Sequence, residues 1–142
     1  ALVAVLAIGL SVGVTVFLLG GDEPQDVAEN AVVEPVKEPA IYLSITPPFL
    51  VTFNVDGRQR YMQISVSVSS RDTSSLDALE HHMPLIRSKL IAMYGAQNFD
   101  DIRTDAGKTS LQAQTVSVIN GVLEAEGANQ IENIFFTNFV LQ

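Results

Sequence analysis

The sequence predicts an α+β protein in which one transmembrane helix precedes a domain whose mostly antiparallel sheet is packed by two helices. Three observations carry this prediction: an uncharged apolar run at residues 1–21, two strand patterns joined by Asp56-Gly57, and two helical patterns before an aromatic C-terminal segment. Strands first, helices next and a strand last are typical of an α+β fold with an antiparallel sheet.

The 142 residues fall into three segments of different composition. Residues 1–21 carry no charge, residues 22–40 carry six acids and one base, and residues 41–142 carry ten acids and seven bases, so the net charges are 0, −5 and −3. A chain with a net charge of −8 and no basic stripe would repel phosphates, which argues against nucleic-acid binding. Because the chain has no cysteine, the sequence neither indicates nor excludes an oxidising compartment.

Residues 1–21 are predicted to form a transmembrane helix. A helix of this length spans roughly 31 Å, which matches a hydrocarbon core of about 30 Å. A cleaved signal peptide is the alternative, but the apolar run is long and no small-x-small cleavage site follows it. The acidic flank favours a non-cytoplasmic domain, periplasmic in a bacterium, with a cytoplasmic N-terminal tail expected before Ala1. Gly9 and Gly13 form a G-x-x-x-G pair that would let two such helices approach closely, although glycine is common in membrane helices.

Residues 22–40 are predicted to be an acidic, proline-containing linker. This segment has three prolines, seven charges and no aromatic residue, so it cannot bury enough apolar surface to offset the entropy of ordering. We therefore expect an extended, solvated tether between the membrane and the domain. If a partner orders the linker, the contact residues would be Val32, Val33 and Val36.

Two adjacent strands open the α+β domain predicted for residues 41–142. The first strand ends in alternating apolar residues, Phe49, Val51, Phe53 and Val55. Asp56-Gly57 then predicts a type I′ hairpin turn, because both central residues of that turn need positive φ. The return strand covers residues 58–69 and has one apolar face, made by Met62, Ile64, Val66 and Val68. Its opposite face is solvated or lies at an interface. Because this face is serine-rich and uncharged, Ser65 and Ser67 are predicted contacts with another subunit, with the helices as the alternative or additional contact surface.

Two amphipathic helices follow the strands. Apolar residues at steps of three and four from Leu76 to Met93 predict the first, which Pro84 should kink or divide and Gly95 should close. The second is predicted over Thr109–Ala125, after an irregular stretch at residues 99–108. Both helices are expected to pack on the apolar face of the return strand. Residues 131–142 predict a final, largely buried strand inside the same sheet.

The sequence offers no arrangement suited to catalysis, so we predict a protein that is not an enzyme and has no catalytic, cofactor-binding or metal-binding residue. His81 and His82 are adjacent and would point about 100° apart on a helix, so they cannot ligate one metal as an i, i+4 pair does. The acids around Asp100 miss the spacing of a calcium loop. Gly107-Lys108-Thr109 lacks the upstream glycine of a phosphate-binding loop, where Ile102 stands.

A series of residues after the apolar run and the acidic linker has a recognisable order: Tyr42, Pro48-Phe49, Asn54, Arg60-Tyr61, Pro84, Ile86, Arg87, Gly107-Lys108, Leu111, Ile119-Asn120 and the ending FFTNFVLQ. In this order the chain resembles, over nearly its whole length, the FliL family of flagellar basal-body-associated membrane proteins of bacteria. The aromatic ending at Gln142 is the most specific part. Ser110 and Gln112 depart from the family pattern, in which charged residues are expected, and this puts a charge-based partner contact there in doubt.

The resemblance implies a periplasmic domain similar to stomatin-type domains, located at the flagellar basal body and the inner membrane. It further implies a homo-oligomeric ring around the ion-driven stator units that supports torque and motility. A general stomatin-like scaffold of the inner membrane is the alternative function, and a periplasmic enzyme or ligand-binding module is a third. We expect the partners to be further copies of the chain, the stator complex and the inner membrane, with no nucleic acid and no small-molecule substrate.

Overall fold

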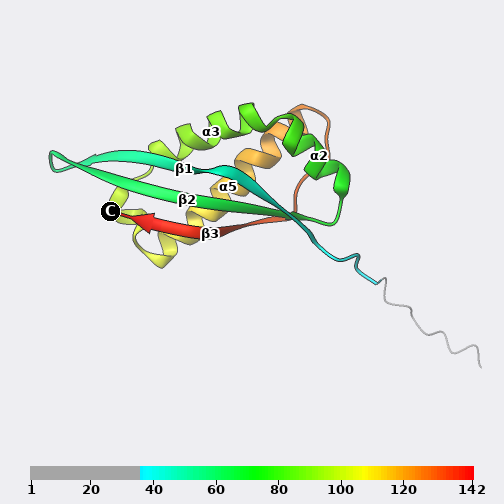
Figure 1. Ribbon diagram of the computed structural model, residues 1–142, viewed down its shortest axis with the longest axis horizontal. Coiled ribbons are helices and arrows are strands. Elements are labelled where there is room, and N and C mark those ends of the chain that lie inside the picture. The colour runs from blue at the N-terminus through cyan, green and yellow to red at the C-terminus, as the bar shows by residue number, and fades with distance from the viewer. Residues whose placement is uncertain (1–35) are drawn as a thin grey trace, which may run out of the picture. The chain divides into compact units, whose positions relative to one another are not determined.

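The middle of the sheet is strand β2 (Arg58–Ser70), which pairs antiparallel with β1 (Ile41–Val55) on one side and with β3 (Asn133–Leu141) on the other. The computed structural model describes residues 36–142 of the chain. Within that range the three strands form one sheet in the order β1-β2-β3, with β1 and β3 at its two edges (Figure 1). The antiparallel sheet predicted from the sequence is confirmed.

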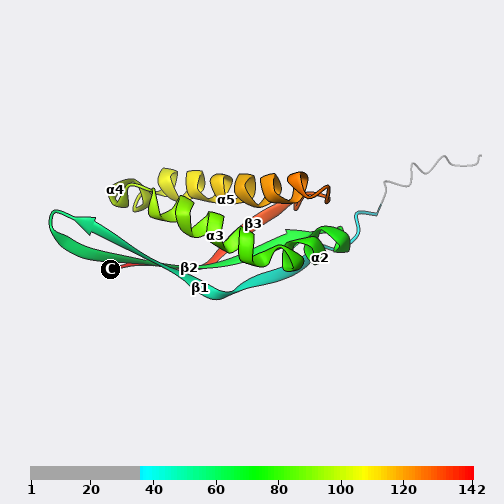
Figure 2. The same ribbon diagram turned by 90° about the horizontal axis from the view of Figure 1, so that it is seen from above.

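The β1–β2 hairpin has the turn that the sequence predicts. Asp56 has a φ of 51° and Gly57 a φ of 75°, the positive angles that a type I′ turn requires. Val55 pairs with Arg58 directly across the turn, and the ladder then continues through both strands. The hairpin end extends past the helices in both views (Figures 1 and 2).

Four helices lie between β2 and β3 in the described part of the chain: α2 (Thr73–His81), α3 (Met83–Gly95), α4 (Phe99–Ile102) and α5 (Asp105–Ala125). Figure 2 shows α2, α3 and α5 on one side of the sheet, with the other side bare. The β2 side chains beneath the helices are at most 1% exposed: Met62, Ile64, Val66 and Val68. The predicted packing of helices on this face is confirmed.

The first predicted helix is divided into α2 and α3. Pro84 was predicted to kink or divide it, and the structure shows the division. α2 ends at His81, and α3 starts at Met83 with Pro84 in its first turn, where a missing N–H breaks no intrahelical hydrogen bond. α3 ends at Gly95, as predicted. α5 starts four residues before the predicted Thr109, because the Thr104 side chain caps it by accepting a hydrogen bond from the Gly107 N–H at 3.0 Å.

The core lies between the sheet and the helices. Its helical residues are at most 6% exposed: Leu76, Leu79, Ile86, Leu90, Tyr94, Ile102, Leu111, Ile119, Val122 and Leu123. The Tyr94 ring meets the Phe49 ring of β1 edge to face at 5.3 Å between centroids. The Tyr94 hydroxyl lies 3.0 Å from Thr115 Oγ1 of α5, so this buried polar group is satisfied.

Strand β1 starts before the alternating residues Phe49 to Val55 and runs through Pro47 and Pro48. Ile45 pairs with Val66 and Phe49 pairs with Ile64, so β1 advances four residues while β2 advances two, and β1 carries two extra residues there. An edge strand tolerates proline because it needs no N–H directed toward a further strand. Arg87 of α3 holds this segment by donating to the Pro47 carbonyl oxygen at 2.7 Å.

Strand β3 pairs with β2 as predicted, but the prediction of a largely buried strand is wrong. Of its nine residues only Ile134 is fully buried. The strand lies at the edge of the sheet, and alternate residues such as Phe135 point to the side that carries no helix. An apolar run was therefore a poor guide to burial here.

The predicted fold class also needs correction. Residues 36–142 form a three-stranded antiparallel sheet with four helices, whereas one transmembrane helix and a sheet with two helices were predicted. None of the helices in this range combines the length and apolarity needed to cross a bilayer. The helix predicted for residues 1–21 lies outside the described residues. The helix count differs because Pro84 divides the first predicted helix and because Asn98 caps the short α4 in a stretch predicted to be irregular.

Candidate interaction surface

The contact residues predicted from the sequence are not all in the described part of the chain. Four lie outside it: Gly9, Gly13, Val32 and Val33. Val36 lies inside it and is 86% exposed. Ser65 and Ser67 lie on β2 and face the side of the sheet that carries no helix. The structure therefore brings together only the two serines.

Aromatic side chains from both edge strands explain why β2 carries serines. Tyr42 of β1 pairs with Ser69, and Phe135 of β3 pairs with Ser67, while the two ring centroids are 6.1 Å apart. The rings therefore meet over β2, where only small side chains leave room beneath them. Ser67 is 7% exposed, so most of the surface here belongs to the aromatic rings and little of it to the serines.

Four large apolar side chains are exposed on this side of the sheet. Tyr42 is 64% exposed, Leu50 67%, and Tyr61 and Phe135 42% each. None of the four was predicted from the sequence to be a contact residue. Tyr61 shares the strand parity of Ser65 and could have been found, but Tyr42, Leu50 and Phe135 reach the same side only through the pairing registers of β1 and β3.

The helix-free face is the set of strand residues that point away from the helices: Tyr42, Ser44, Leu50, Thr52, Asn54, Gln59, Tyr61, Gln63, Ser65, Ser67, Ser69, Asn133, Phe135, Asn138 and Val140. Not one of these residues carries a formal charge. The domain as a whole has ten acids and seven bases, so an uncharged face of this extent is a local departure from its composition. Exposed apolar groups in a polar, uncharged setting mark a surface suited to protein contact.

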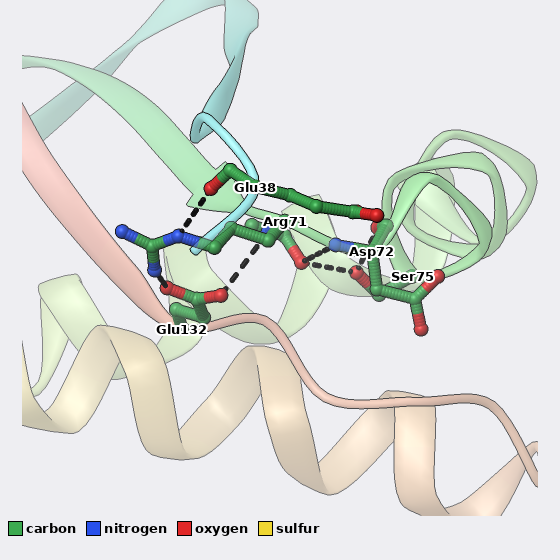
Figure 3. Close-up of polar contacts among 6 residues, drawn as sticks. Glu38, Arg71, Asp72, Ser75 and Glu132 are labelled. Carbon is green, nitrogen blue, oxygen red and sulfur yellow. Dashed lines mark hydrogen bonds and ion pairs between the residues drawn. The ribbon is translucent and has the colours of Figure 1, made fainter. Parts of the chain in front are cut away.

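Arg71 joins three segments where the chain enters the domain (Figure 3). Its Nε donates to the Glu38 carbonyl oxygen at 2.7 Å, its backbone N–H donates to Glu132 Oε1 at 3.2 Å, and its Nη1 forms an ion pair with Glu132 Oε2. The two side chains are 39% and 44% exposed, so the ion pair contributes about 0–1 kcal/mol. Its main effect is to fix the start of β1 against the start of β3.

Asp72 caps α2 beside this junction. Its Oδ1 accepts hydrogen bonds from the Ser74 hydroxyl at 2.7 Å and the Ser74 N–H at 2.9 Å, and its Oδ2 accepts one from Asn129 at 2.6 Å. These hydrogen bonds, that of the Ser74 hydroxyl first, hold the pKa of Asp72 below its ordinary value of 3.8. Ser75 completes the junction by donating to the Asp72 carbonyl oxygen at 2.7 Å (Figure 3).

His81, His82 and Asp100 contact other groups of the domain. The rings of His81 and His82 lie edge to face at 4.8 Å, and His82 Nε2 is 4.0 Å from Glu126 Oε2. Asp100 lies in the first turn of α4, where its N–H donates to Asn98 Oδ1 at 2.9 Å. Across residues 36–142, no three His, Cys, Asp or Glu side chains come together in a way that could hold a metal ion.

A groove of 460 Å³ lies beside the hairpin end. One wall is β1 from Thr52 to Val55 with Asp56, and the other is the turn between α3 and α4, with Gln97, Asn98 and Phe99. We call it the tip groove. It leaves open space between the end of β1 and this turn.

Known proteins match the same part of the chain that forms this domain. The family model described as flagellar basal body-associated protein FliL matches residues 42–142. A curated protein named flagellar protein FliL from Aquifex aeolicus (strain VF5) is 28% identical over 105 residues, which cover 74% of this chain and 63% of the relative. One of the same name from Escherichia coli (strain K12) is 24% identical over 92 residues, which cover 64% of this chain and 60% of the relative. The chain thus spans about three-fifths of the length of these relatives.

Proposed function

Because the chain belongs to the FliL family of flagellar basal body-associated proteins, we propose that it is a non-enzymatic accessory of the flagellar motor that assembles as an oligomeric ring around the stator units. The ring lies on the periplasmic side of the inner membrane and supports torque generation and motility. Its partners are further copies of the chain and the stator complex.

The observation that supports this proposal is the uncharged helix-free face with its four exposed apolar side chains. A mechanical support needs an extended contact surface and no reactive groups. Tyr and Phe supply large contact areas with few rotatable bonds, so little side-chain entropy is lost on contact. The polar residues between them remain solvated in a free copy.

The test places a charge in the middle of this face. Tyr61 lies on the central strand and is 42% exposed, so Tyr61→Glu should leave the fold intact while adding an unpaired charge that any contact would have to desolvate. The matched control is Leu85→Glu on α3, which changes a side chain of similar exposure, 43%, on the helix side of the domain. Swimming in soft agar and crosslinking of the full chain to itself and to stator subunits in native membranes are the measurements.

We expect Tyr61→Glu to lose crosslinks to stator subunits and swimming speed, and Leu85→Glu to keep both. If both variants behave like the unaltered protein, the face is not the contact surface. If a strain lacking the gene swims normally and shows altered membrane organisation, the motor role is wrong and a general scaffold of the inner membrane replaces it.

A further inference from the structure

The pairing of β2 with β3 determines which backbone groups of β1 are free. Tyr61 of β2 donates its N–H to the Gln142 carbonyl oxygen at 2.8 Å, and its carbonyl oxygen accepts from the Gln142 N–H at 2.9 Å. In an antiparallel ladder, residues alternate between bonding to one neighbour and bonding to the other. Thr52, which lies opposite Tyr61 on β1, therefore directs its own N–H and C=O away from the sheet, and so do Leu50 and Asn54.

The same alternation applies to β3 at the opposite edge. Gln142 bonds to Tyr61, so Leu141 and Phe139 direct their backbone groups outward. Nearer the start of β3, α5 covers one outward carbonyl, since the Gln112 side chain donates to the Ile134 oxygen at 2.6 Å. No hydrogen bond joins the outward groups of Leu50, Thr52, Asn54, Phe139 or Leu141 to another segment of residues 36–142.

The edge of β1 after Pro47-Pro48 and the C-terminal part of the β3 edge lack two of the features that protect edge strands, although the β2–β3 ladder has a register shift at Ser65/Val66. Charged side chains, prolines and covering elements usually block pairing between edges. From Leu50 to Val55 and from Phe135 to Gln142 the chain has no charged residue and no proline. Thr52 and Asn54 both line the tip groove, so there is open space next to this part of β1.

We propose that copies of this chain join by strand addition, with the β3 edge of one copy on the β1 edge of the next. The occupant is a second copy because the two edges offer complementary rows of N–H and C=O groups. They are also uncharged segments of a domain with a net charge of −3, so two such domains repel each other least there. β1 and β3 both run antiparallel to β2, so they run parallel to each other. If neighbouring copies have the same orientation, β3 of one copy therefore pairs parallel with β1 of the next.

Two different edges meeting head to tail form a heterologous contact, and such a contact closes into a ring when the rotation between copies allows it. The sheet would then continue around the ring, with the helices on one surface and the helix-free faces on the other. This inference rests on the proposed function for ring closure, but not for the contact between edges.

The main variant is Thr52→Pro in the full chain. Proline removes the outward N–H, which the β1–β2 ladder does not use, so a free copy should fold while strand addition is blocked. The control is Thr52→Val, which keeps the N–H. Circular dichroism and thermal unfolding check that both variants fold. We expect Thr52→Pro to weaken self-association, measured by sedimentation in detergent, by about 10-fold or more and Thr52→Val to leave it unchanged.

Disulfide crosslinking tests the pairing directly, because the chain has no cysteine of its own. Proteins carrying Thr52→Cys and Val140→Cys are mixed in membranes and oxidised, with Ser117→Cys on α5 replacing Val140→Cys as the control. Within one copy the positions 52 and 140 are separated by β2, roughly 10 Å, which is too far for a disulfide. A bond between them therefore joins two copies.

We expect the 52–140 disulfide and no 52–117 disulfide. If the unaltered chain forms rings but Thr52→Pro also does, and no 52–140 bond forms, strand addition is wrong while the ring remains. If Thr52→Cys links mainly to itself, β1 pairs with β1 in a two-fold dimer and the head-to-tail contact is wrong. A chain that stays monomeric in membranes overturns both this inference and the ring.

Discussion

Several side chains of this domain join segments that lie far apart in the sequence. Asn120 of α5 accepts from the Ile131 N–H at 2.8 Å and donates to the Ile131 carbonyl oxygen at 3.3 Å, which positions the segment leading into β3. Arg87 lies over the Phe49 ring at 4.4 Å and bonds to Pro47. The family features at these positions thus have a role in holding the fold, and none needs a ligand to explain it.

Tyr94 shows how burial makes one side chain sensitive to pH. Burial raises the pKa of Tyr94 to about 12 from an ordinary value of 10.0, against the smaller opposing effect of the Thr115 hydrogen bond. The unfolded chain therefore ionises at a lower pH than the folded one. The stability that Tyr94 contributes is fully present below pH 10 and is lost as the pH rises from 10 through about 12.

We predict that Tyr94→Phe reduces the loss of stability between pH 8 and pH 11 by about 1 kcal/mol, because at pH 11 the tyrosine of the unfolded chain is ionised and the buried one is not, and one pKa unit corresponds to about 1.4 kcal/mol. Urea unfolding of the purified chain at the two pH values measures the effect. Tyr42→Phe is the control, since Tyr42 is 64% exposed. An equal loss in the unaltered protein and in Tyr94→Phe would contradict the role of Tyr94.

At the scale of elements, the cap of α2 couples helix stability to acid pH. The pKa of Asp72 is lowered by its bonds to Ser74 and Asn129, so the carboxylate stabilises the fold above the ordinary pKa of 3.8, and this contribution is lost as the pH falls through the lower folded value. Asn caps helices nearly as well as Asp but does not titrate.

We therefore expect Asp72→Asn to flatten the fall of the thermal midpoint between pH 7 and pH 3, with little change in the midpoint at pH 7. Asp77→Asn on the same helix is the control because its carboxylate forms no side-chain hydrogen bond among the contacts recorded for residues 36–142. The prediction fails if Asp77→Asn flattens the profile as much as Asp72→Asn does.

The contact between α4 and α5 depends on one glycine. A Cβ placed on Gly107 would lie 1.8 Å from the Asp101 carbonyl oxygen and 2.6 Å from its carbonyl carbon. These are backbone atoms and cannot turn aside, so any side chain at this position must push the two helices apart. The Gly107-Lys108 pair in the family resemblance is thereby explained by close packing, with Lys108 placed 5.5 Å from the Phe139 ring of β3.

We predict opposite effects for two glycine substitutions in α5. Gly107→Ala should destabilise the domain by about 1–3 kcal/mol, at the upper end because the obstacle is backbone. Gly121→Ala should stabilise it by about 0.5–1 kcal/mol, because a Cβ there meets nothing within 4 Å and alanine is the better helix former. Urea unfolding of both variants measures this. Changes of the same sign would show that helix propensity, and not the contact with Asp101, governs position 107.

The described domain separates its charges from its bare sheet face. Helices and loops carry most of the acids, whereas the helix-free face and the two free edges carry none. Copies that meet through uncharged strands still repel each other through their net charge, and salt screens this repulsion.

Self-association of the full chain should therefore increase with salt. Raising the ionic strength from about 0.01 M to about 0.15 M shortens the Debye length from about 30 Å to about 8 Å, which should increase the oligomeric fraction seen by sedimentation. A contact built on ion pairs would respond in the opposite direction. Dissociation on adding salt would thus contradict an uncharged interface, and a non-ionic osmolyte at equal osmolality controls for solvent effects.

Local features of the described domain could be predicted from the amino-acid sequence alone. The positive φ angles at Asp56-Gly57, the apolar face from Met62 to Val68 and the break at Pro84 each depend on a few neighbouring residues, whose steric and solvation preferences act wherever the segment lies. The predicted contacts Ser65 and Ser67 were placed on the correct side of β2 for the same reason.

The residues that cover those serines and the strand edges that remain open could not be predicted in this way, because they depend on how distant segments pair. The meeting of Tyr42 with Phe135, the position of β3 at an edge and the outward groups of Thr52 all depend on pairing registers between segments up to about a hundred residues apart. A one-residue change of register would turn each of these side chains to the other face, and no local preference fixes the register. Long-range packing of the helices on one face of the sheet sets it, and with it the surface left for partners.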